Sequence, residues 1–385
     1  MTEWKEYKLG EIADVQTGPF GSQLHMSDYQ DEGTPIITVE HLGDNRIIHN
    51  NLPLVGEKDK NRLKKYVLAE GDIVFSRVGS VDRRAYVSAN EDGWMFSGRC
   101  LRVRPTQEVD SKFLSYYFGL EDFKETIRRI AVGATMPSIN TTILSNVVIP
   151  LPPIDTQQRI ASILSSLDDK IDLLHRENKT LEAMAETLFR QWFIEEAKED
   201  WEEGKLGDEF EFIMGQSPSG ESFNEEGAGI PMYQGNADFG FRFPTKRIFT
   251  TQPTKFAEIN DTLISVRAPV GAQNMAIERC CIGRGVAAFR YKNNSLFYSY
   301  TYYKLKSLLK EIKQYNDNGT VFGSISKSDF ENLDIVIPDK DTILNFQKQV
   351  KPIDDKIINN NKQIQTLIQQ RDGLLPKLMS GEVKI

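Results

Sequence analysis

The chain passes from strand-like to helix-like sequence within the stretch Leu151-Pro152-Pro153-Ile154-Asp155-Thr156-Gln157-Gln158-Arg159-Ile160. A β-branched run ends at the prolines, which lack a backbone donor but are tolerated in the first turn of a helix. Beyond them, apolar residues recur in alternating steps of four and three, the heptad spacing of a coiled coil. This seam comprises Ile160, Leu164, Leu167, Ile171, Leu174, Asn178, Leu181, Ala185, Leu188 and Trp192. The stretch therefore predicts a long helix that pairs with another helix; an amphipathic helix lying on its own domain is the alternative.

A second heptad seam near the end of the sequence supplies the partner. It comprises Phe346, Val350, Ile353, Ile357, Asn360, Ile364, Leu367, Arg371, Leu374 and Leu378. If the helices are antiparallel and facing residue numbers sum to 538, Asn178 faces Asn360 and every other seam residue faces a seam residue. A buried amide without a partner costs on the order of 1–3 kcal/mol. We therefore predict this register.

The two helices belong to a duplicated plan. Trp4-Lys5-Glu6-Tyr7-Lys8-Leu9-Gly10 recurs as Trp201-Glu202-Glu203-Gly204-Lys205-Leu206-Gly207, an offset of 197. Leu167-Asp168-Asp169-Lys170-Ile171 superposes on Ile353-Asp354-Asp355-Lys356-Ile357 at an offset of 186, and the strand-like run ending at Pro152 matches the one ending at Pro338 at the same offset. The offset changes only through the globular parts, where loop lengths vary. The chain is thus an internal repeat.

Each globular part reads as mixed structure. Short β-rich runs, such as Asp72-Ile73-Val74-Phe75-Ser76, alternate with Gly, Pro and Asn turns, and helical patches follow near 110–130 and 295–314. The predicted fold class is α+β, with two mixed domains joined by two long helices that form an antiparallel coiled coil with pseudo-twofold symmetry. The predicted segments are domain 1 at 1–153, helix 1 at 154–198, domain 2 at 199–338 and helix 2 at 339–385.

Charge and composition limit the class of protein. The net charge is −8, but the segment 155–203 holds thirteen acids against six bases and so accounts for −7 of it. The remainder is close to neutral and can carry basic surfaces. No apolar run is long enough for a membrane helix, and the charged start of the chain lacks the features of a secretory signal. Three cysteines cannot form a disulfide framework, so a reducing cytoplasm is expected.

Motifs for catalysis are missing from the sequence. It contains no phosphate-binding Gly-x-x-x-x-Gly-Lys-Ser/Thr loop, no Gly-x-Gly-x-x-Gly turn and no Asn/Asp-Pro-Pro-aromatic motif. The four histidines lack metal-ligand spacing, and Cys280-Cys281 has no second cysteine pair. We therefore predict no catalytic residue, no metal site and no cofactor bound by this chain.

The combination of these features resembles the specificity subunit of type I restriction–modification enzymes over essentially the whole chain. The stretch from Leu151 to Ile160 is similar to the family's Pro-Pro-Leu-x-Glu-Gln-x-x-Ile helix start. Thr17-Gly18-Pro19-Phe20-Gly21-Ser22 and Gly215-Gln216-Ser217-Pro218-Ser219-Gly220 resemble the openings of two target-recognition domains. Thr156 stands in place of the usual glutamate, and the second helix start, from Pro338 to Phe346, lacks the glutamine.

The resemblance implies a non-catalytic subunit that grips two half-sites of double-stranded DNA. The helix pair would set the distance between the two half-sites. Its seam of 33 residues spans roughly 50 Å at about 1.5 Å per residue. Methylation subunits, expected to number two, would dock on the helices and bring S-adenosylmethionine. Restriction subunits would add translocation driven by ATP with Mg²⁺. The acidic first helix fits a protein-facing surface, and a solvated charge run is the alternative.

Within the resemblance, basic and amide side chains on loops are the candidates for DNA contact, because cations hold phosphates and Arg, Asn or Gln read bases. In domain 1 these are Arg77, Arg83, Arg84, Arg99, Arg102 and Arg104, with Ser22, Gln23 and His25 after the glycine-rich opening. In domain 2 they are Lys246, Arg247, Arg267, Gln273, Asn274, Arg279 and Arg284. The alternatives are surface ion pairs for the arginines and a structural Gly-Pro turn for the opening.

Two pairs of candidates stand out because the repeat places them at matching positions. Arg77 follows Gly-Asp-Ile-Val-Phe-Ser, which resembles the run before Arg267, and Gly98-Arg99 matches Gly283-Arg284. Other functions remain open from sequence: a scaffold that binds protein or carbohydrate through two modules, a self-contained nuclease, or a dimeric repressor.

Overall fold

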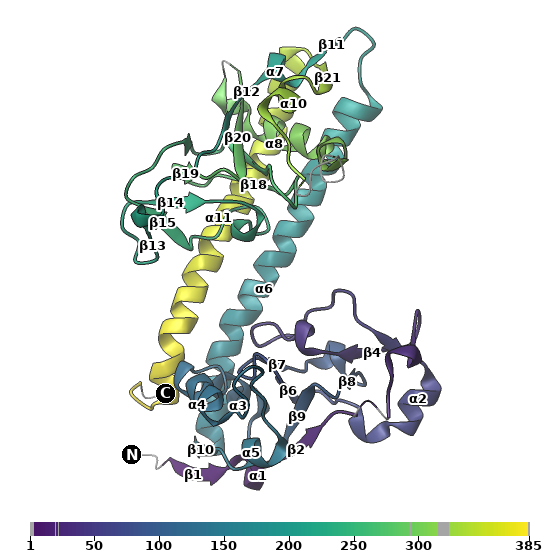
Figure 1. The fold of residues 1–385 in the computed structure, drawn as a ribbon, viewed down its shortest axis with the longest axis vertical. Helices are drawn as coiled ribbons and strands as arrows, with labels where there is room; N and C mark the ends of the chain where they lie inside the picture. Colours follow the sequence, from purple (N-terminus) through teal and green to yellow (C-terminus); the bar gives the residue numbers. More distant parts are fainter. Residues whose placement is uncertain (1–3, 20, 22, 293, 315–322, 384–385) are drawn as a thin grey trace. The chain divides into compact units, whose positions relative to one another are not determined.

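The computed structural model describes residues 4–19, 21, 23–292, 294–314 and 323–383. Two compact units are present: unit 1 comprises 1–172 with 364–385, and unit 2 comprises 173–363. Each unit therefore contains one globular part together with a segment of each long helix. These helices are α6 (Ile154–Arg190) and α11 (Lys340–Met379), shown in teal and yellow in Figure 1.

Unit 1 combines short strands with short helices. Its strands are β1 (Lys5–Lys8), β2 (Ala13–Thr17), β3 (Tyr29–Gln30), β4 (Thr34–Ile37), β5 (Leu54–Val55), β6 (Ile73–Ser76), β7 (Arg84–Tyr86), β8 (Met95–Phe96), β9 (Cys100–Pro105) and β10 (Val148–Leu151). Its helices are α1 (Leu9–Ile12), α2 (Glu57–Arg62), α3 (Ser111–Tyr117), α4 (Glu121–Ile130) and α5 (Thr141–Ser145), with 3-10 turns η1 (Met26–Asp28), η2 (Val39–His41), η3 (Lys64–Tyr66) and η4 (Ala89–Glu91).

Two four-stranded sheets carry unit 1. One has the order β2-β9-β6-β7 and the other β3-β5-β4-β8, while β1 pairs with β10. The first sheet packs its apolar side chains, such as Phe75 and Leu101, against Phe113 of α3 and Leu164 of α6 in one buried cluster. The second sheet has a separate core around Ile36 and Phe96. The unit thus has an inner sheet against the helices and an outer sheet beyond it.

Unit 2 repeats this inventory. Its strands are β11 (Glu202–Lys205), β12 (Phe210–Met214), β13 (Phe223–Asn224), β14 (Ile230–Tyr233), β15 (Ile248–Thr250), β16 (Phe256–Ala257), β17 (Thr262–Ser265), β18 (Gln273–Met275), β19 (Cys280–Ile282), β20 (Val286–Tyr291) and β21 (Asp334–Ile337). Its helical segments are the π-helical turn η5 (Gln191–Glu195), α7 (Leu206–Glu209), η6 (Gly220–Ser222), η7 (Asn236–Asp238), η8 (Ser295–Phe297), α8 (Tyr298–Ser307), α9 (Leu309–Lys313) and α10 (Lys327–Glu331).

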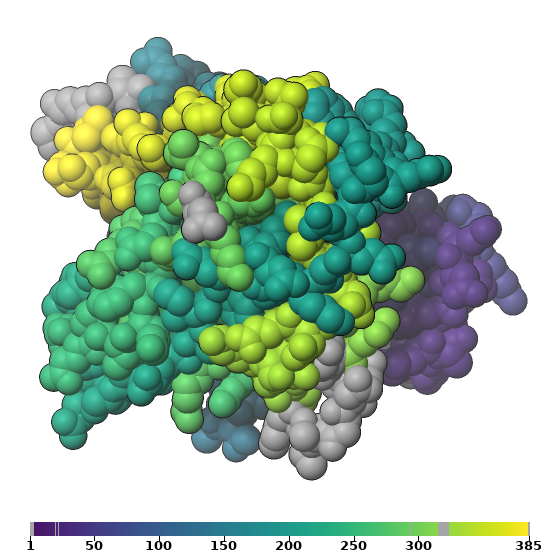
Figure 2. Space-filling model, turned by 90° about the horizontal axis from the view of Figure 1, so that it is seen from above, coloured from purple at the N-terminus to yellow at the C-terminus, as the bar shows by residue number. Residues whose placement is uncertain are grey.

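The sheets of unit 2 confirm the predicted repeat. The order β12-β20-β17-β18 corresponds strand for strand to β2-β9-β6-β7, and β11 pairs with β21 as β1 pairs with β10. The outer sheet, β13-β15-β14-β19-β16, has one strand more than its counterpart. In Figure 1, β13, β14 and β15 lie on the far side of β20 from β21. Figure 2 shows a face of unit 2 on which teal atoms near the start of the unit lie beside yellow-green atoms near its end, in agreement with the β11–β21 pairing.

The seams of the long helices are buried as the heptads predict. Ile160, Leu164, Ile171 and Leu174 of α6 are at most 2% exposed, and the remaining seam positions are buried or half-buried. In unit 2, Asn360 donates its Nδ2–H to Oδ1 of Asn178 at 2.9 Å. In the same unit, the rings of Trp192 and Phe346 lie 6.1 Å apart. Both contacts join residues whose numbers sum to 538, so the predicted antiparallel register is confirmed in this unit.

A buried glutamine near the start of each long helix accepts backbone N–H groups of the helical region it packs on. Gln157 Oε1 accepts the N–H of Asp110 at 3.0 Å. Gln347 Oε1 accepts those of Ser299 and Tyr300 at 3.1 and 3.2 Å. The second helix therefore does carry such a glutamine, at Gln347, immediately after the stretch in which the sequence lacked it.

Candidate nucleic-acid interface

Two exposed arginines of unit 2 come together at one end of the inner sheet. Antiparallel neighbours β17 and β20 end at the Ser265–Val286 pair. Beyond this pair, Val266 donates to the carbonyl of Gly285 at 2.9 Å. Arg267 follows the first strand and Arg284 precedes the second, and both side chains are exposed. Both arginines line one groove of about 580 Å³, which their charges make basic.

Polar side chains from two further loops complete this groove. Gln234 and Asn236 follow strand β14, and Ser217 comes from the glycine-rich opening of the domain. Ser217 Oγ accepts the backbone N–H of Arg284 at 3.3 Å. Our sequence reasoning missed Gln234 and Asn236. The signal that could have found them is a Gln-Gly-Asn turn directly after a buried strand.

The corresponding loop end of unit 1 carries Arg77 and Arg99. The N–H of Arg77 donates to the carbonyl of Arg99 at 2.8 Å, beyond the Ser76–Cys100 pair of β6 and β9. Arg99 is exposed, whereas the half-buried side chain of Arg77 donates to the carbonyl of Gly98 at 3.1 Å. Arg99 therefore presents its guanidinium to solvent more fully than Arg77 does.

The backbone hydrogen bonds correct the matching of arginines between the units. The Arg77–Arg99 bond of unit 1 corresponds to the Val266–Gly285 bond of unit 2. The carbonyl of Arg77 accepts from Ile139, as that of Val266 accepts from Ile325. Arg77 is therefore equivalent to Val266 and Arg99 to Gly285, so the predicted pairs Arg77–Arg267 and Arg99–Arg284 are each displaced by one residue. A one-residue insertion or deletion within a loop is invisible to short sequence matches.

Arg104 has a structural role that the repeat reveals. Its Nε and Nη2 both donate to the buried carboxylate of Asp72, at 2.7 Å each. In unit 2, the guanidinium of Arg290 grips Asp261 in the same way, with Nε at 3.0 Å. Both aspartates also accept a backbone N–H three residues earlier, from Ala69 and Glu258. We call these two bidentate pairs, Asp72–Arg104 and Asp261–Arg290, the frame pairs.

Arg84 and Gln273 also serve the fold. They occupy the same position of β7 and β18, and each donates to a carbonyl of the helix behind the sheet: Arg84 Nε to Ser115 at 3.2 Å and Gln273 Nε2 to Tyr302 at 2.7 Å. Arg84 is 5% exposed. Arg84 is therefore too deeply buried for the predicted DNA contact, and half-buried Gln273 already uses its amide N–H within the protein.

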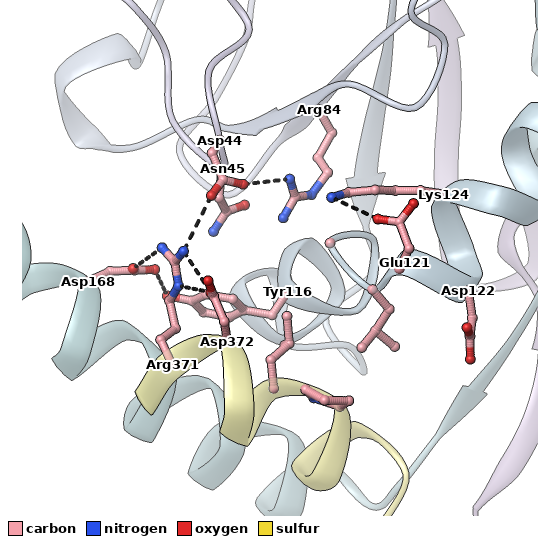
Figure 3. Close-up of a pocket in the computed structure, with 14 residues that line it drawn as sticks. Asp44, Asn45, Arg84, Tyr116, Glu121, Asp122, Lys124, Asp168, Arg371 and Asp372 are labelled. Atoms are coloured by element: carbon pink, nitrogen blue, oxygen red, sulfur yellow. Dashed lines mark hydrogen bonds and ion pairs between the residues drawn. The ribbon is translucent and has the colours of Figure 1, made fainter. Parts of the chain in front are cut away.

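Arg84 belongs to an ion-pair cluster shown in Figure 3. Asp44 lies between two guanidiniums, with its oxygens 3.3 Å from Arg84 Nη1 and 3.5 Å from Arg371 Nη2. Although burial opposes the shift, these two cations hold the pKa of Asp44 below its usual value. Arg371 also binds Asp168 of α6 at 2.9 Å. This explains how a charged residue occupies a position of the heptad seam.

Two further candidates are buried and so cannot reach a duplex. Arg102 is 5% exposed and bridges the carbonyl of Lys65 and the carboxylate of Asp14. Asn274 is 1% exposed, and its amide bonds both the N–H and the carbonyl of Gly240. The sequence-based assignment of both to DNA contact is wrong for the same physical reason: strand residues with inward side chains are not on the surface.

The remaining candidates are at least partly accessible. Arg83 donates to the carbonyl of Leu42, and Gln23 accepts from Tyr66 at 2.7 Å. Lys246 pairs with Glu278 at 2.6 Å, and Arg247 pairs with Asp238. His25 and Arg279 are exposed, the latter over the ring of Phe256 at 4.1 Å. Ser22 lies outside the described residues.

Within the described ranges, no group of three or more His, Cys, Asp or Glu side chains is arranged to hold a metal ion. No helix in this part of the chain is long and apolar enough to cross a membrane. The two similar mixed units, each with arginines at one end of an inner sheet, and the paired helices define a class: a binding protein with two modules.

Comparison with known proteins gives the family. The model for the type I restriction modification DNA specificity domain matches residues 1–183 and 198–370. The chain belongs to this family, in two copies of the domain. A putative type I restriction enzyme specificity subunit, MjaX of Methanocaldococcus jannaschii, is 32% identical over all of this chain and 94% of its own length. The HindI specificity subunit of Haemophilus influenzae is 23% identical over the full length of both chains.

A solved structure has the same fold. The S subunit of a type I restriction–modification system from M. genitalium matches with a TM-score of 0.62 and 20% identity over 98% of this chain and 96% of the other. The expected fold, with two mixed domains and a long-helix pair, is confirmed.

Proposed function

We propose that this chain is the DNA sequence-specificity subunit of a type I restriction–modification complex and is itself non-catalytic. Each unit would read one half of a bipartite site in double-stranded DNA, and the helix pair would set the spacing. The observation that carries the proposal is the duplicated loop end, where exposed arginines follow or precede paired inner strands in both units. Exposed guanidiniums suit phosphate contact and base readout.

Membership of the family supports the proposed partners. Methylation subunits, two in the proposed complex, would dock on the helices and supply S-adenosylmethionine, and restriction subunits would supply ATP- and Mg²⁺-dependent translocation and cleavage. The chain itself would bind no cofactor, and the complex would work in the cytoplasm, where its DNA is. The acidic segment 155–203, which includes the exposed Asp169, offers charge complementary to a basic docking surface on a partner.

The proposed DNA-contacting set is smaller than the one drawn from sequence. It keeps Arg77, Arg83, Arg99, Lys246, Arg247, Arg267 and Arg284, together with Ser22 and Gln23, and adds Gln234 and Asn236. Arg84, Arg102 and Asn274 leave the set because they are buried. Arg104 leaves it because its guanidinium holds Asp72, and Gln273 because its amide N–H donates to Tyr302.

The test is to express the chain with its methylation subunit in a host without other adenine methylation and to sequence the modified adenines. We expect one motif with two specified halves separated by unspecified bases. A contiguous motif, or no sequence-dependent methylation from an assembled complex, would contradict the proposal. As a control for catalysis, the isolated chain with Mg²⁺ should leave plasmid intact; cleavage that copurifies with the chain would favour a nuclease.

A further inference from the structure

Gln234 is held against the two glycines that flank Arg284. The carbonyl of Tyr233 accepts the N–H of Gly283 at 2.8 Å, where β14 lies beside β19 (Figure 1). A Cβ on Gly285 would lie 2.1 Å from the carbonyl oxygen of Gln234, and one on Gly283 would lie 3.3 Å from its Cγ. Close approach of the two backbones therefore requires glycine at 285 and places Gln234 beside Arg284.

The loop that carries Gln234 is fixed, but its amide side chain is exposed. The N–H of Gln234 donates to Oδ2 of Asp238 at 2.6 Å, and the same buried aspartate holds Arg247. Asp238 N–H closes the turn on the carbonyl of Gly235 at 3.1 Å. Gln234, Asn236 and Arg284 are all exposed along the groove. A rigid backbone with exposed polar ends is what base readout needs.

The loop that carries Gln234 is one residue longer than the matching loop of unit 1. Ser97 donates to the carbonyl of Ile37 as Gly283 donates to that of Tyr233, and His41 donates to Thr38 as Asp238 donates to Gly235. Ile37 and Thr38 are adjacent, whereas Gln234 stands between Tyr233 and Gly235. The additional residue in this loop therefore distinguishes unit 2 from unit 1 at an otherwise matching place.

The chemistry of this pair favours base edges over phosphates. A phosphate needs only cations and donors, whereas an amide that both donates and accepts matches adenine N7 and N6–H₂ in the major groove. A guanidinium matches guanine O6 and N7 with two donors. We propose, resting on the function proposed above, that Gln234 and Arg284 are specificity-determining residues of unit 2, with Gln234 reading an adenine and Arg284 a guanine.

The test uses the full chain with its methylation subunit and compares methylation motifs of variants. Gln234→Ala should relax one adenine position in one half of the motif, lowering discrimination there by roughly 5- to 150-fold, the range for one bidentate contact. Gln234→Glu should shift the preference at that position toward cytosine, whose N4–H₂ donates to a carboxylate. Arg284→Ala should relax a guanine position in the same half.

Matched controls separate readout from folding. Gln252→Ala removes an exposed glutamine from another loop of unit 2 and should leave the motif unchanged. Thermal denaturation of each variant should match that of the unmodified chain, because Gln234 keeps its backbone contacts when its side chain is shortened. An unchanged motif in Gln234→Ala, or a loss of binding that is equal for all sequences, overturns this inference. If the complex with the native sequence of this chain methylated no bipartite motif, the proposed function itself would be overturned.

Discussion

Asp72 and Asp261 explain why a sequence rich in arginine offers fewer DNA contacts than it suggests. Each carboxylate is buried and captures a guanidinium from the neighbouring strand, Arg104 or Arg290. These partners lie about thirty residues away along the chain and become neighbours only through strand pairing. Sequence could therefore identify an arginine cluster but could not separate its internal members from its exposed ones.

Replacement of Arg104 tests its structural role. Arg104→Met should lower the free energy of unfolding by about 2–3 kcal/mol, because the buried Asp72 carboxylate loses two charged hydrogen bonds. Urea denaturation measures the loss. Arg99→Met, at an exposed position of the same unit, is the control and should cost close to nothing. Equal effects of the two substitutions would contradict the assignment.

Exposed arginines should instead affect DNA affinity. If Arg99 reads a base, Arg99→Ala should lower the discrimination between the preferred base and the others at one position by roughly 1–3 kcal/mol. If it holds a phosphate, all sequences should lose affinity similarly and the salt slope should fall by about one. Arg77→Ala is the companion variant and tests the half-buried neighbour. Fluorescence anisotropy against specific and random duplexes distinguishes these results, and unchanged binding to both would remove the residue from the interface.

Glu209 makes the stability of unit 2 depend on pH. Burial raises the pKa of this carboxyl to about 7, although Lys304 and a hydrogen bond from Tyr300 oppose the shift. The folded state therefore keeps its proton where the unfolded chain, with a pKa of 4.5, has lost it. The contribution of Glu209 to the free energy of unfolding is therefore greatest below about pH 4.5. It falls by about 3 kcal/mol at most as the pH rises to about 7.

The variant Glu209→Gln should remove this dependence while its amide oxygen still accepts from Tyr300. We expect the difference in unfolding free energy between pH 5 and pH 8 to shrink by about 1–3 kcal/mol. Urea denaturation of unit 2 at both pH values, followed by tyrosine and tryptophan fluorescence, gives the measurement. Glu221→Gln, at an exposed site, should leave the profile as it is. An unchanged profile for Glu209→Gln would show that Glu209 is ionised in the folded state.

At the scale of elements, the long helices were predictable and the short strands were only partly so. Ten seam positions in each helix repeat one spacing, and so long a regular pattern favours a coiled coil over an amphipathic helix on its own domain. Many strands have only two to four residues, and their pairing depends on contacts far along the chain. The extra strand of the outer sheet in unit 2, β16, has only two residues and gives no periodic signal.

The asparagine pair fixes the register of the helices. Asn178→Leu should cost about 1–3 kcal/mol, because Asn360 loses a buried partner and keeps only Glu177. The double variant with Asn360→Leu should recover this stability and lose register specificity.

Disulfide crosslinking reports the register. Ile171→Cys with Leu367→Cys should crosslink in the native background, and Ile171→Cys with Leu374→Cys, one heptad away, should not. In the double leucine background we expect both crosslinks. A crosslink only at the shifted position in the native background would contradict the predicted register.

At the scale of the whole molecule, duplication made the architecture readable from sequence. Two helices with one offset identified two equivalent halves, and their sheets have matching strand orders. The candidate interfaces with DNA were less predictable, because differences of one residue in loop length change which residues correspond. Sequence matches aligned the arginines of the two units with an error of one residue. Backbone hydrogen bonds were needed to find the equivalent residue in the other unit.

Two units without shared partners at their loop ends should contribute independently to binding. The double variant Arg99→Ala with Arg284→Ala should lose the sum of the two single losses in binding free energy, within about 0.5 kcal/mol. Anisotropy titrations of the two single variants and the double variant with the same duplex give the comparison. A larger coupling would show that the two readers influence each other through the chain or the DNA.

The frame pairs have a consequence for how such a protein can change its target. Asp72–Arg104 and Asp261–Arg290 tie neighbouring strands of the inner sheet at the strand ends opposite the loops that carry Arg99 and Arg267. A loop at those opposite strand ends can therefore gain or lose a residue without breaking either ion pair. Recombination between genes could exchange whole loops next to these repeated anchors, so that new specificities arise by transplanting segments rather than by gradual substitution.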